Sequence, residues 1–242
     1  MRRVVLMLLW VSLFGGLGAG ARAQSLYGPG GLFLNPTADV PPKGQLTAGL
    51  IVLEQRIPST PGLHEFPVWV SGSLDYGVTP DVEIGFTSLG ITDFETSFGG
   101  SFKYRILRES AKYPAVAAGF GITGYGGSDS QLGFVALRKQ VSQSASHPVV
   151  AHLGLQYISM LAGLEYHQFL PYGGVEVGLA RRWTFIGEVR PRGKGDFKTS
   201  TGVSVAYDYG HGGRLVLTYS NTGQSTQSRF GFGVGYGIGG RR

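Results

Sequence analysis

The run RFGFGVGYGIGG, residues 229–240, decides the fold, because it alternates strictly between large apolar side chains and glycine. Phe230, Phe232, Val234, Tyr236 and Ile238 take every second position, and glycine stands at each position between them. Successive side chains of a β-strand point to opposite faces of the sheet. The run therefore predicts a strand with one apolar face and one face that carries almost no side chains.

The same period of two recurs along most of the chain, for example in VEIGFTS from residue 82 and in GGVEVGLA from residue 173. Most of these runs approach the 9–11 residues of a tilted membrane-spanning strand, whereas strands of soluble sandwiches are shorter, at about 5–6 residues. We expect about twelve strands, at residues 45–54, 67–76, 81–89, 96–106, 114–124, 131–140, 149–158, 170–180, 182–190, 198–208, 213–220 and 229–239.

The connections between these runs alternate in length. Short turns follow the second, eighth and tenth strands, whereas 55–66 and 159–169 belong to the other set of connections and are long. Outer-membrane barrels have short periplasmic turns and longer outer loops. The segments 108–114 and 141–148 depart from this pattern, since they are long on the expected periplasmic side.

The predicted fold is therefore an all-β, transmembrane, antiparallel up-and-down barrel. Lipid offers no hydrogen-bond partners to an open sheet edge, so a spanning sheet must close on itself. Aromatic residues near strand ends are expected to form the two interfacial girdles, namely Trp69, Tyr76, Tyr157, Tyr172, Trp183 and Tyr209. The motif Arg229, Gly231, Val234 and Tyr236 resembles the signal that the barrel-assembly machinery reads, although six residues follow it.

The first 23 residues have the pattern of a cleaved signal peptide. Arg2 and Arg3 precede the apolar run 4–13, and residues 21–23 read Ala-Arg-Ala, a small-x-small cleavage site. We divide the chain into a signal peptide (1–23), a periplasmic Gly/Pro-rich lead-in (24–44) and an outer-membrane barrel (45–242).

Composition excludes several classes of function. The predicted leader holds three of the 21 Lys and Arg residues, so the net charge falls from +6 to +3 when it is removed, too weak for a nucleic-acid-binding protein. There is no cysteine, hence no disulfide, thiolate metal site or cysteine nucleophile. Lipid and lipopolysaccharide of the outer membrane are the expected surroundings.

The stretch LYGPGGLFLNPTADVPPKGQL, residues 26–46, which includes most of the lead-in, resembles the start of the YjbH-type exopolysaccharide-associated outer-membrane family. The residues that carry the resemblance are Gly28, Pro29, Gly31, Leu32, Asn35, Pro36, Thr37, Ala38, Pro42 and Gly44. The resemblance implies a role in surface polysaccharide export, with export components as partners. We expect Leu32 to Leu34 to tuck under or into the periplasmic mouth, with residues 35–37 turning towards the first strand.

No motif for catalysis or cofactor binding emerges. Lys43-Gly44 reverses the order that a phosphate-binding loop requires. His64, His147, His167 and His211 lie in or beside predicted loops, and His152 faces the lumen without a local serine partner. Asp75 with Asp81, and Asp93 with Glu95, are unspecific candidates for bound Ca²⁺. We predict no enzyme, no cofactor and no metal site.

The best functional lead is a set of charged residues on the lumen face. By strand parity these are Glu83, Lys103, Arg105, Glu176, Arg182, Glu188 and Arg190. They either brace the barrel as ion pairs or line a constriction for anionic substrates. We therefore expect an outer-membrane barrel with a structural or transport role, connected by the family resemblance to polysaccharide export. A small porin-like channel for anionic solutes is the alternative, and a lipid-modifying enzyme is the least favoured one.

Overall fold

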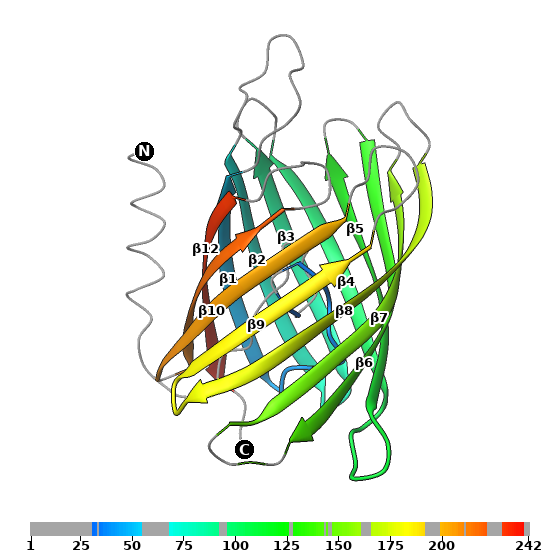
Figure 1. Cartoon of the computed structure of the whole chain (residues 1–242). Helices are drawn as coiled ribbons and strands as arrows, with labels where there is room; N and C mark the ends of the chain where they lie inside the picture. Colours follow the sequence, from blue (N-terminus) through cyan, green and yellow to red (C-terminus); the bar gives the residue numbers. More distant parts are fainter. Residues whose placement is uncertain are drawn as a thin grey trace.

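The computed structural model describes residues 31–32, 34–54, 68–91, 96–125, 128–142, 144, 147–160, 166–191, 199–210, 212–221 and 229–239. In these residues, twelve antiparallel strands form one closed barrel, in which each strand pairs with its neighbours in sequence and β12 pairs with β1 (Figure 1). They are β1 (Gln45–Glu54), β2 (Val68–Thr79), β3 (Val82–Ile91), β4 (Ser97–Leu107), β5 (Ala115–Tyr125), β6 (Ser128–Ser142), β7 (Val149–Met160), β8 (Tyr166–Ala180), β9 (Trp183–Arg190), β10 (Ser200–Gly210), β11 (Gly213–Ser220) and β12 (Arg229–Gly239). The predicted all-β up-and-down barrel is confirmed, while the predicted signal peptide lies outside the described residues.

Several strands are longer than the sequence pattern predicts, β6 and β8 most of all. β6 and β8 each have 15 residues, and both extend beyond their predicted starts at 131 and 170. Ser130 of β6 and Tyr166 of β8 both pair with Met160, the last residue of β7. β6 begins two residues before this, at Ser128, which pairs with Tyr125 of β5. The added residues of both strands therefore pair with neighbouring strands, which local alternation does not reveal.

The glycine-rich strand β12 closes the barrel. β12 pairs with β1 from Gln45↔Gly239 to Leu53↔Gly231, and with β11 on its other side. Its glycines at 231, 233 and 237 are buried, whereas Phe230 on the other face is 77 % exposed. The alternation thus places the glycine face inward and the apolar face outward.

The same division runs around the whole wall. Buried Thr47, Ser71 and Ser73 face inward, while large apolar side chains such as Phe98, Phe169 and Leu217 are more than 60 % exposed on the outside. An exposed apolar surface of this extent is unfavourable in water. The outer face is therefore suited to contact with hydrocarbon.

All five hairpins at the end where β1 begins, the lower end in Figure 1, contain a β-bulge or register shift. The turns after β2, β8 and β10 are short, as predicted. Bulges increase local twist and occur often at barrel rims. Part of the connection 108–114 is held by two hydrogen bonds of 3.0 Å, in which the Ser110 backbone N–H donates to the Tyr113 carbonyl oxygen and the Tyr113 backbone N–H donates to the Ser110 hydroxyl oxygen.

The prediction of the aromatic girdles is wrong for two of its six residues, which do not lie on the outer face. Tyr76, Trp183 and Tyr209 are exposed on the outer face, whereas Trp69 and Tyr172 are buried. Trp69 shares the inward face of β2 with Ser71, and Tyr172 shares that of β8 with Gly174. Strand parity decides their direction, and proximity to a strand end does not. Among the described residues there is no helix long and apolar enough to cross a membrane.

Candidate functional site

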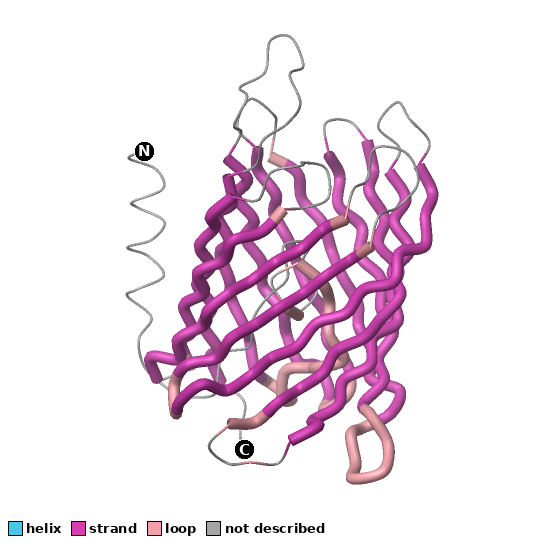
Figure 2. Tube along the Cα trace, viewed as in Figure 1, coloured by secondary structure: helices cyan, strands magenta, loops and turns pink. Residues whose placement is uncertain are grey.

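The described part of the lead-in, residues 31–44 without residue 33, is called the inner segment below. It runs inside the barrel in Figure 2, as the pink tube crossing the lumen. A tight turn forms in it, because Leu32 N–H donates to the Asn35 carbonyl at 2.9 Å and Gly31 forms a bridge with Pro36. A side chain at Gly31 would meet the Asn35 carbonyl oxygen at 2.3 Å, so this position needs glycine.

The tip of the inner segment is buried in an apolar cluster. Leu32 and Leu34 are 0 % and 1 % exposed. They share the cluster with inward side chains of β1, β2, β9, β10 and β11, which are Ile51, Leu53, Trp69, Ile186, Ala206 and Val216. The segment therefore reaches far beyond the periplasmic mouth where the sequence analysis placed it, since Leu53 and Trp69 lie at the opposite ends of their strands from the hairpin turns.

Glu188 of β9 holds the backbone of the segment in place. Its two carboxylate oxygens accept the Leu34 backbone N–H, each at 3.0 Å, and one of them accepts Asn35 Nδ2–H at 2.9 Å. Glu188 is buried. Hydrogen bonds to a charged acceptor are stronger than those between neutral groups, so this carboxylate fixes the position of the turn.

A second set of charged contacts holds the segment near Asp39. Lys103 Nζ donates to the Asp39 carbonyl oxygen at 2.8 Å and lies 2.9 Å from Glu83 Oε2. Arg138 of β6 pairs with the Asp39 carboxylate at 3.3 Å and also with Glu109. The segment is thus attached at two places to opposite parts of the wall.

The structure brings most of the predicted lumen residues inside the barrel. Glu83, Lys103, Glu188 and Arg190 are buried on inward faces. Glu176 is partly exposed and lies 2.9 Å from His152 Nε2. Arg105 is at the rim, where it pairs with Asp81 at 3.0 Å.

The prediction for Arg182 is wrong. β8 ends at Ala180 and β9 starts at Trp183, so Arg182 belongs to the turn and strand parity does not apply to it. It is exposed, and its guanidinium reaches the hydroxyl of Tyr207 at 3.4 Å. The Tyr207 ring packs at a tilt against that of Trp183 on the outer side of the rim, away from the lumen.

Sequence reasoning did not select Asp39, Arg138 and Arg214. Arg214 pairs with Asp208 at 2.8 Å across β10 and β11. Arg138 follows Phe134 and Ala136 at alternate positions, so the parity rule could have placed it inward. No local pattern could have indicated Asp39, because its partners lie on β4 and β6.

At the rim formed by the hairpin turns, Asp81 accepts hydrogen bonds from two arginines. Arg108 donates to both of its carboxylate oxygens, at 2.9 and 2.6 Å, and Arg105 donates at 3.0 Å. The hydrogen bonds from Arg108 lower the pKa of Asp81 from 3.8 to about 2, against the opposing effect of burial. The same contacts raise the pKa of the Arg108 guanidinium. This cluster stays charged at all physiological pH values.

On the inner face of β7 and β8, three buried side chains have atoms without a hydrogen-bond partner in the described part of the chain, although His152 Nε2 lies close to Glu176. They are His152, Gln156 and Tyr172, all buried. The prediction that His152 faces the lumen is confirmed. His147 is exposed at the rim, and its Nδ1 lies 3.1 Å from the Gly178 carbonyl oxygen. His167 is exposed beside Tyr157. His64 and His211 lie outside the described residues.

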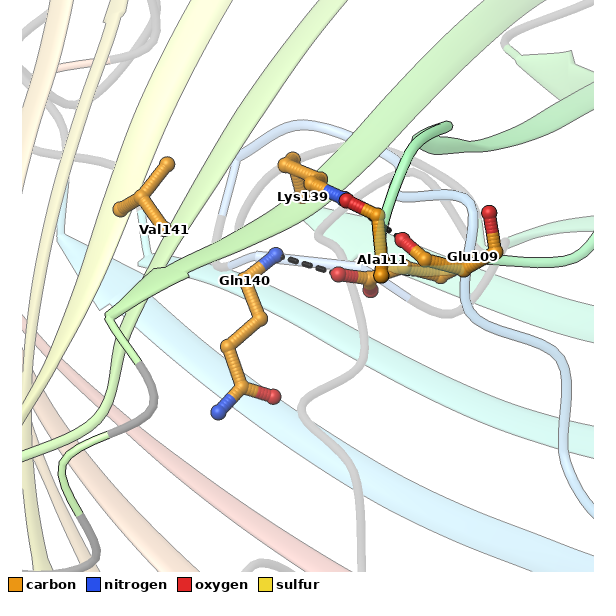
Figure 3. A pocket seen from close by; sticks show the side chains of 6 residues that line it. Glu109, Ala111, Lys139, Gln140 and Val141 are labelled. Carbon is orange, nitrogen blue, oxygen red and sulfur yellow. Dashed lines mark hydrogen bonds between the residues drawn. The ribbon is translucent and has the colours of Figure 1, made fainter.

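An open recess at the rim is formed by Glu109, Ser110, Ala111, Lys139, Gln140 and Val141 (Figure 3). Its charged groups hold the loop in place. Glu109 accepts the Gln140 backbone N–H, and Lys139 Nζ donates to the carbonyls of Ser110 and Ala111 at 2.6 and 2.9 Å. The recess therefore serves to attach the 108–114 connection to β6.

Within the described ranges, no three His, Asp or Glu residues are grouped so that they could hold a metal ion. The candidate pair Asp93 and Glu95 lies outside these ranges. Asp75 is buried on the inner face of β2, and Asp81 is engaged by arginines.

The residues of the family resemblance are in part those of the inner segment. Gly28 and Pro29 lie outside the described residues. Gly31, Asn35, Pro36, Thr37 and Ala38 are all buried in the lumen, while Pro42 and Gly44 are exposed beside the start of β1. Gly44 has φ of 77° and donates its N–H to the Gly77 carbonyl at 2.7 Å, which turns the segment into the strand.

The solved structures that are similar to this chain include porins. A KdgM porin superposes with a TM-score of 0.58 at 10 % identity, covering 81 % of this chain and 99 % of that one. A KdgM porin in complex with disordered oligogalacturonate gives a TM-score of 0.59 at 12 % identity over 80 % and 99 %. A NanC porin gives 0.53 at 11 % identity over 79 % and 97 %. No family model and no curated protein matches the sequence. The chain therefore has a porin-like β-barrel fold.

Proposed function

We propose that this protein is an outer-membrane barrel of porin type whose own inner segment narrows the passage through the lumen. The apolar outer face and the closed sheet support a membrane location. The likeness to KdgM and NanC porins supports the comparison with channels rather than with enzymes. The observation that carries the proposal is the attachment of the inner segment inside the lumen.

This attachment combines apolar burial with charge. Leu32 and Leu34 are enclosed by wall residues, and Glu188 and Lys103 hold the backbone on either side of them. A segment held in this way occupies the lumen for most of the time. We therefore expect passage of small hydrophilic solutes only, with a low conductance in the resting state.

The solute selectivity follows from how the lumen charges are arranged. Lys103, Arg138 and Arg214 each pair with a carboxylate at 3.3 Å or less. Paired charges produce a weaker field along the lumen than an unopposed basic ring would. This arrangement favours the bracing hypothesis over a channel for anionic solutes.

The anion-selective alternative still has one supporting comparison. One of the KdgM structures was obtained with oligogalacturonate, an anionic saccharide. In this chain Arg105 and Arg190 would be the basic residues concerned. If the bracing hypothesis is correct, replacing both by serine should leave the reversal potential in a KCl gradient unchanged. If the channel selects anions, the same replacement should shift the reversal potential towards cation selectivity.

The polysaccharide-export role remains a proposal that rests on the YjbH-type resemblance. The resembling residues build the inner segment, so their spacing also has a structural explanation. Export components of the envelope would then be the partners. A deletion strain with unchanged surface polysaccharide would exclude this role and leave the channel proposal intact.

Planar-bilayer conductance tests the main proposal. The purified full chain should give small, stable steps. Replacing Glu188 by alanine should add larger and longer openings, because the segment is released more often. A wild type that conducts as well as the Glu188→Ala variant would contradict the proposal, as would two proteins that never conduct.

A further inference from the structure

The inner face of β7 and β8 carries a group of polar atoms that the fold itself does not use. His152, Gln156 and Tyr172 are 1 %, 0 % and 4 % exposed. His152 Nδ1, both amide atoms of Gln156 and the Tyr172 hydroxyl have no hydrogen-bond partner in the described part of the chain. Buried polar groups are normally paired, so these four atoms require an explanation.

Strand pairing brings these atoms into one patch, called the β7–β8 patch below. His152, Gly154 and Gln156 occupy successive inward positions of β7, and Tyr172 of β8 pairs with Gly154. A Cβ added at Gly154 would lie 2.2 Å from Tyr172 Cζ and 2.3 Å from its hydroxyl oxygen. The phenol ring therefore lies across Gly154, with His152 on one side and Gln156 on the other.

The inner segment covers this patch. Leu32 Cδ1 is 2.3 Å from the Cβ position of Gly174, which is the residue paired with His152. Ala38 packs in the same apolar cluster as Tyr172. An apolar cover would be matched best by leucine or phenylalanine in the wall. The wall instead carries an imidazole, an amide and a phenol beside the place where Leu32 and Ala38 pack.

The chemistry of these groups indicates a class of ligand. An amide and a phenol both donate and accept hydrogen bonds, as the hydroxyls of a sugar do. The carboxylate of Glu176, 2.9 Å from His152 Nε2, disfavours an anionic ligand at this place. We propose that the β7–β8 patch is a binding subsite for a neutral saccharide, exposed when the inner segment withdraws from the wall.

This inference deepens the proposed function and has a consequence of its own. A ligand that binds only the withdrawn arrangement shifts the protein towards that arrangement. By linkage, weakening the Glu188 contacts must strengthen saccharide binding, because less of the binding free energy is used to displace the segment. A transported saccharide would thus open its own path.

Isothermal titration of the full chain in detergent with maltotriose tests the subsite without any need for conductance. We expect weak binding to the wild type and at least tenfold tighter binding to Glu188→Ala. Adding Gln156→Leu or Tyr172→Phe to that variant should weaken binding at least fivefold, and trigalacturonate should bind more weakly than maltotriose.

Gln45→Leu is the matched control, since Gln45 is a buried glutamine on the inner face of β1, which is six strands from β7 and five from β8 in the barrel order. It should leave binding unchanged in the Glu188→Ala background. Heat-modifiable gel mobility confirms folding of each variant, and Tyr172→Phe removes a single oxygen only. Absence of maltotriose binding to Glu188→Ala, or equal binding with Gln156→Leu, overturns the subsite. Conductance steps that survive such a result would leave the proposed function standing.

Discussion

Glu188→Ala is the most informative perturbation of the inner segment, because one side chain accepts two of the hydrogen bonds that hold it. The Leu34 backbone N–H and the Asn35 amide donate to this carboxylate at 2.9–3.0 Å. Hydrogen bonds to charged groups contribute about 1.5–3 kcal/mol each. We use the lower value, about 3 kcal/mol for the two, since the variant also removes a buried charge with its desolvation cost.

A weakening of about 3 kcal/mol raises the population of the withdrawn segment about a hundredfold. The chain contains no cysteine, so a single Ala38→Cys substitution gives a unique thiol at a position that is 0 % exposed. A maleimide reagent can label this thiol only while the segment is withdrawn. The labelling rate should therefore rise about a hundredfold when Glu188→Ala is added.

The matched control is Glu176→Ala, which removes an inward carboxylate that pairs with His152 on the wall. It should change the labelling rate of Ala38→Cys less than threefold. Equal rates in the Glu188 and Glu176 variants would refute the assignment of Glu188 as the specific anchor. Rapid labelling of Ala38→Cys alone would show that the segment does not rest in the lumen.

Three further predictions concern the wall. Lys103→Met should lower the free energy of unfolding in urea by about 3–5 kcal/mol, because it leaves Glu83 buried without this ion pair. Adding Glu83→Met to the same chain should restore most of the lost stability. Gly77→Ala should reduce the folded fraction on heat-modifiable gels, since the new Cβ would lie 2.2 Å from a carbonyl oxygen of the inner segment. Gly100→Ala should leave the folded fraction unchanged, because the atom nearest to its Cβ would be 3.7 Å away. The pKa of Asp81 is lowered to about 2, so the stabilisation from this carboxylate is complete above pH 3.8 and is lost as the pH falls through about 2. An NMR titration of the Asp81 carboxyl group with its midpoint near pH 4 would contradict the arginine contacts.

The barrel could be predicted from the sequence because its signal is local. Each strand repeats a period of two, and the direction of Glu83 or Lys103 follows from the position of its neighbours in the same strand. The two-residue turns are equally local. The errors arose where a residue left the strand, as Arg182 does, or where proximity to a strand end replaced parity, as for Trp69 and Tyr172.

The course of the inner segment could not be predicted in this way. Its contacts join residues far apart in the chain, with 154 positions between Leu34 and Glu188. Residues 31–44 have no regular period, and their prolines exclude most sheet pairing. Only the buried, paired charges of the wall indicate where the segment lies, and these require the three-dimensional arrangement.

The glycines of the inner wall leave space in the barrel interior that the side chains of the inner segment fill. A barrel of this size must fill its interior with side chains or leave it to water. Here Leu32 fits against Gly174 and Leu34 lies 3.3 Å from the Cβ position of Gly202, so glycines on β8 and β10 leave the space that the two leucines occupy. Ordinary side chains at these glycines would fill the interior permanently. Under the proposed function, a glycine wall with a segment attached by a few charged contacts would fill the same volume reversibly, as a passage that opens for its solute requires.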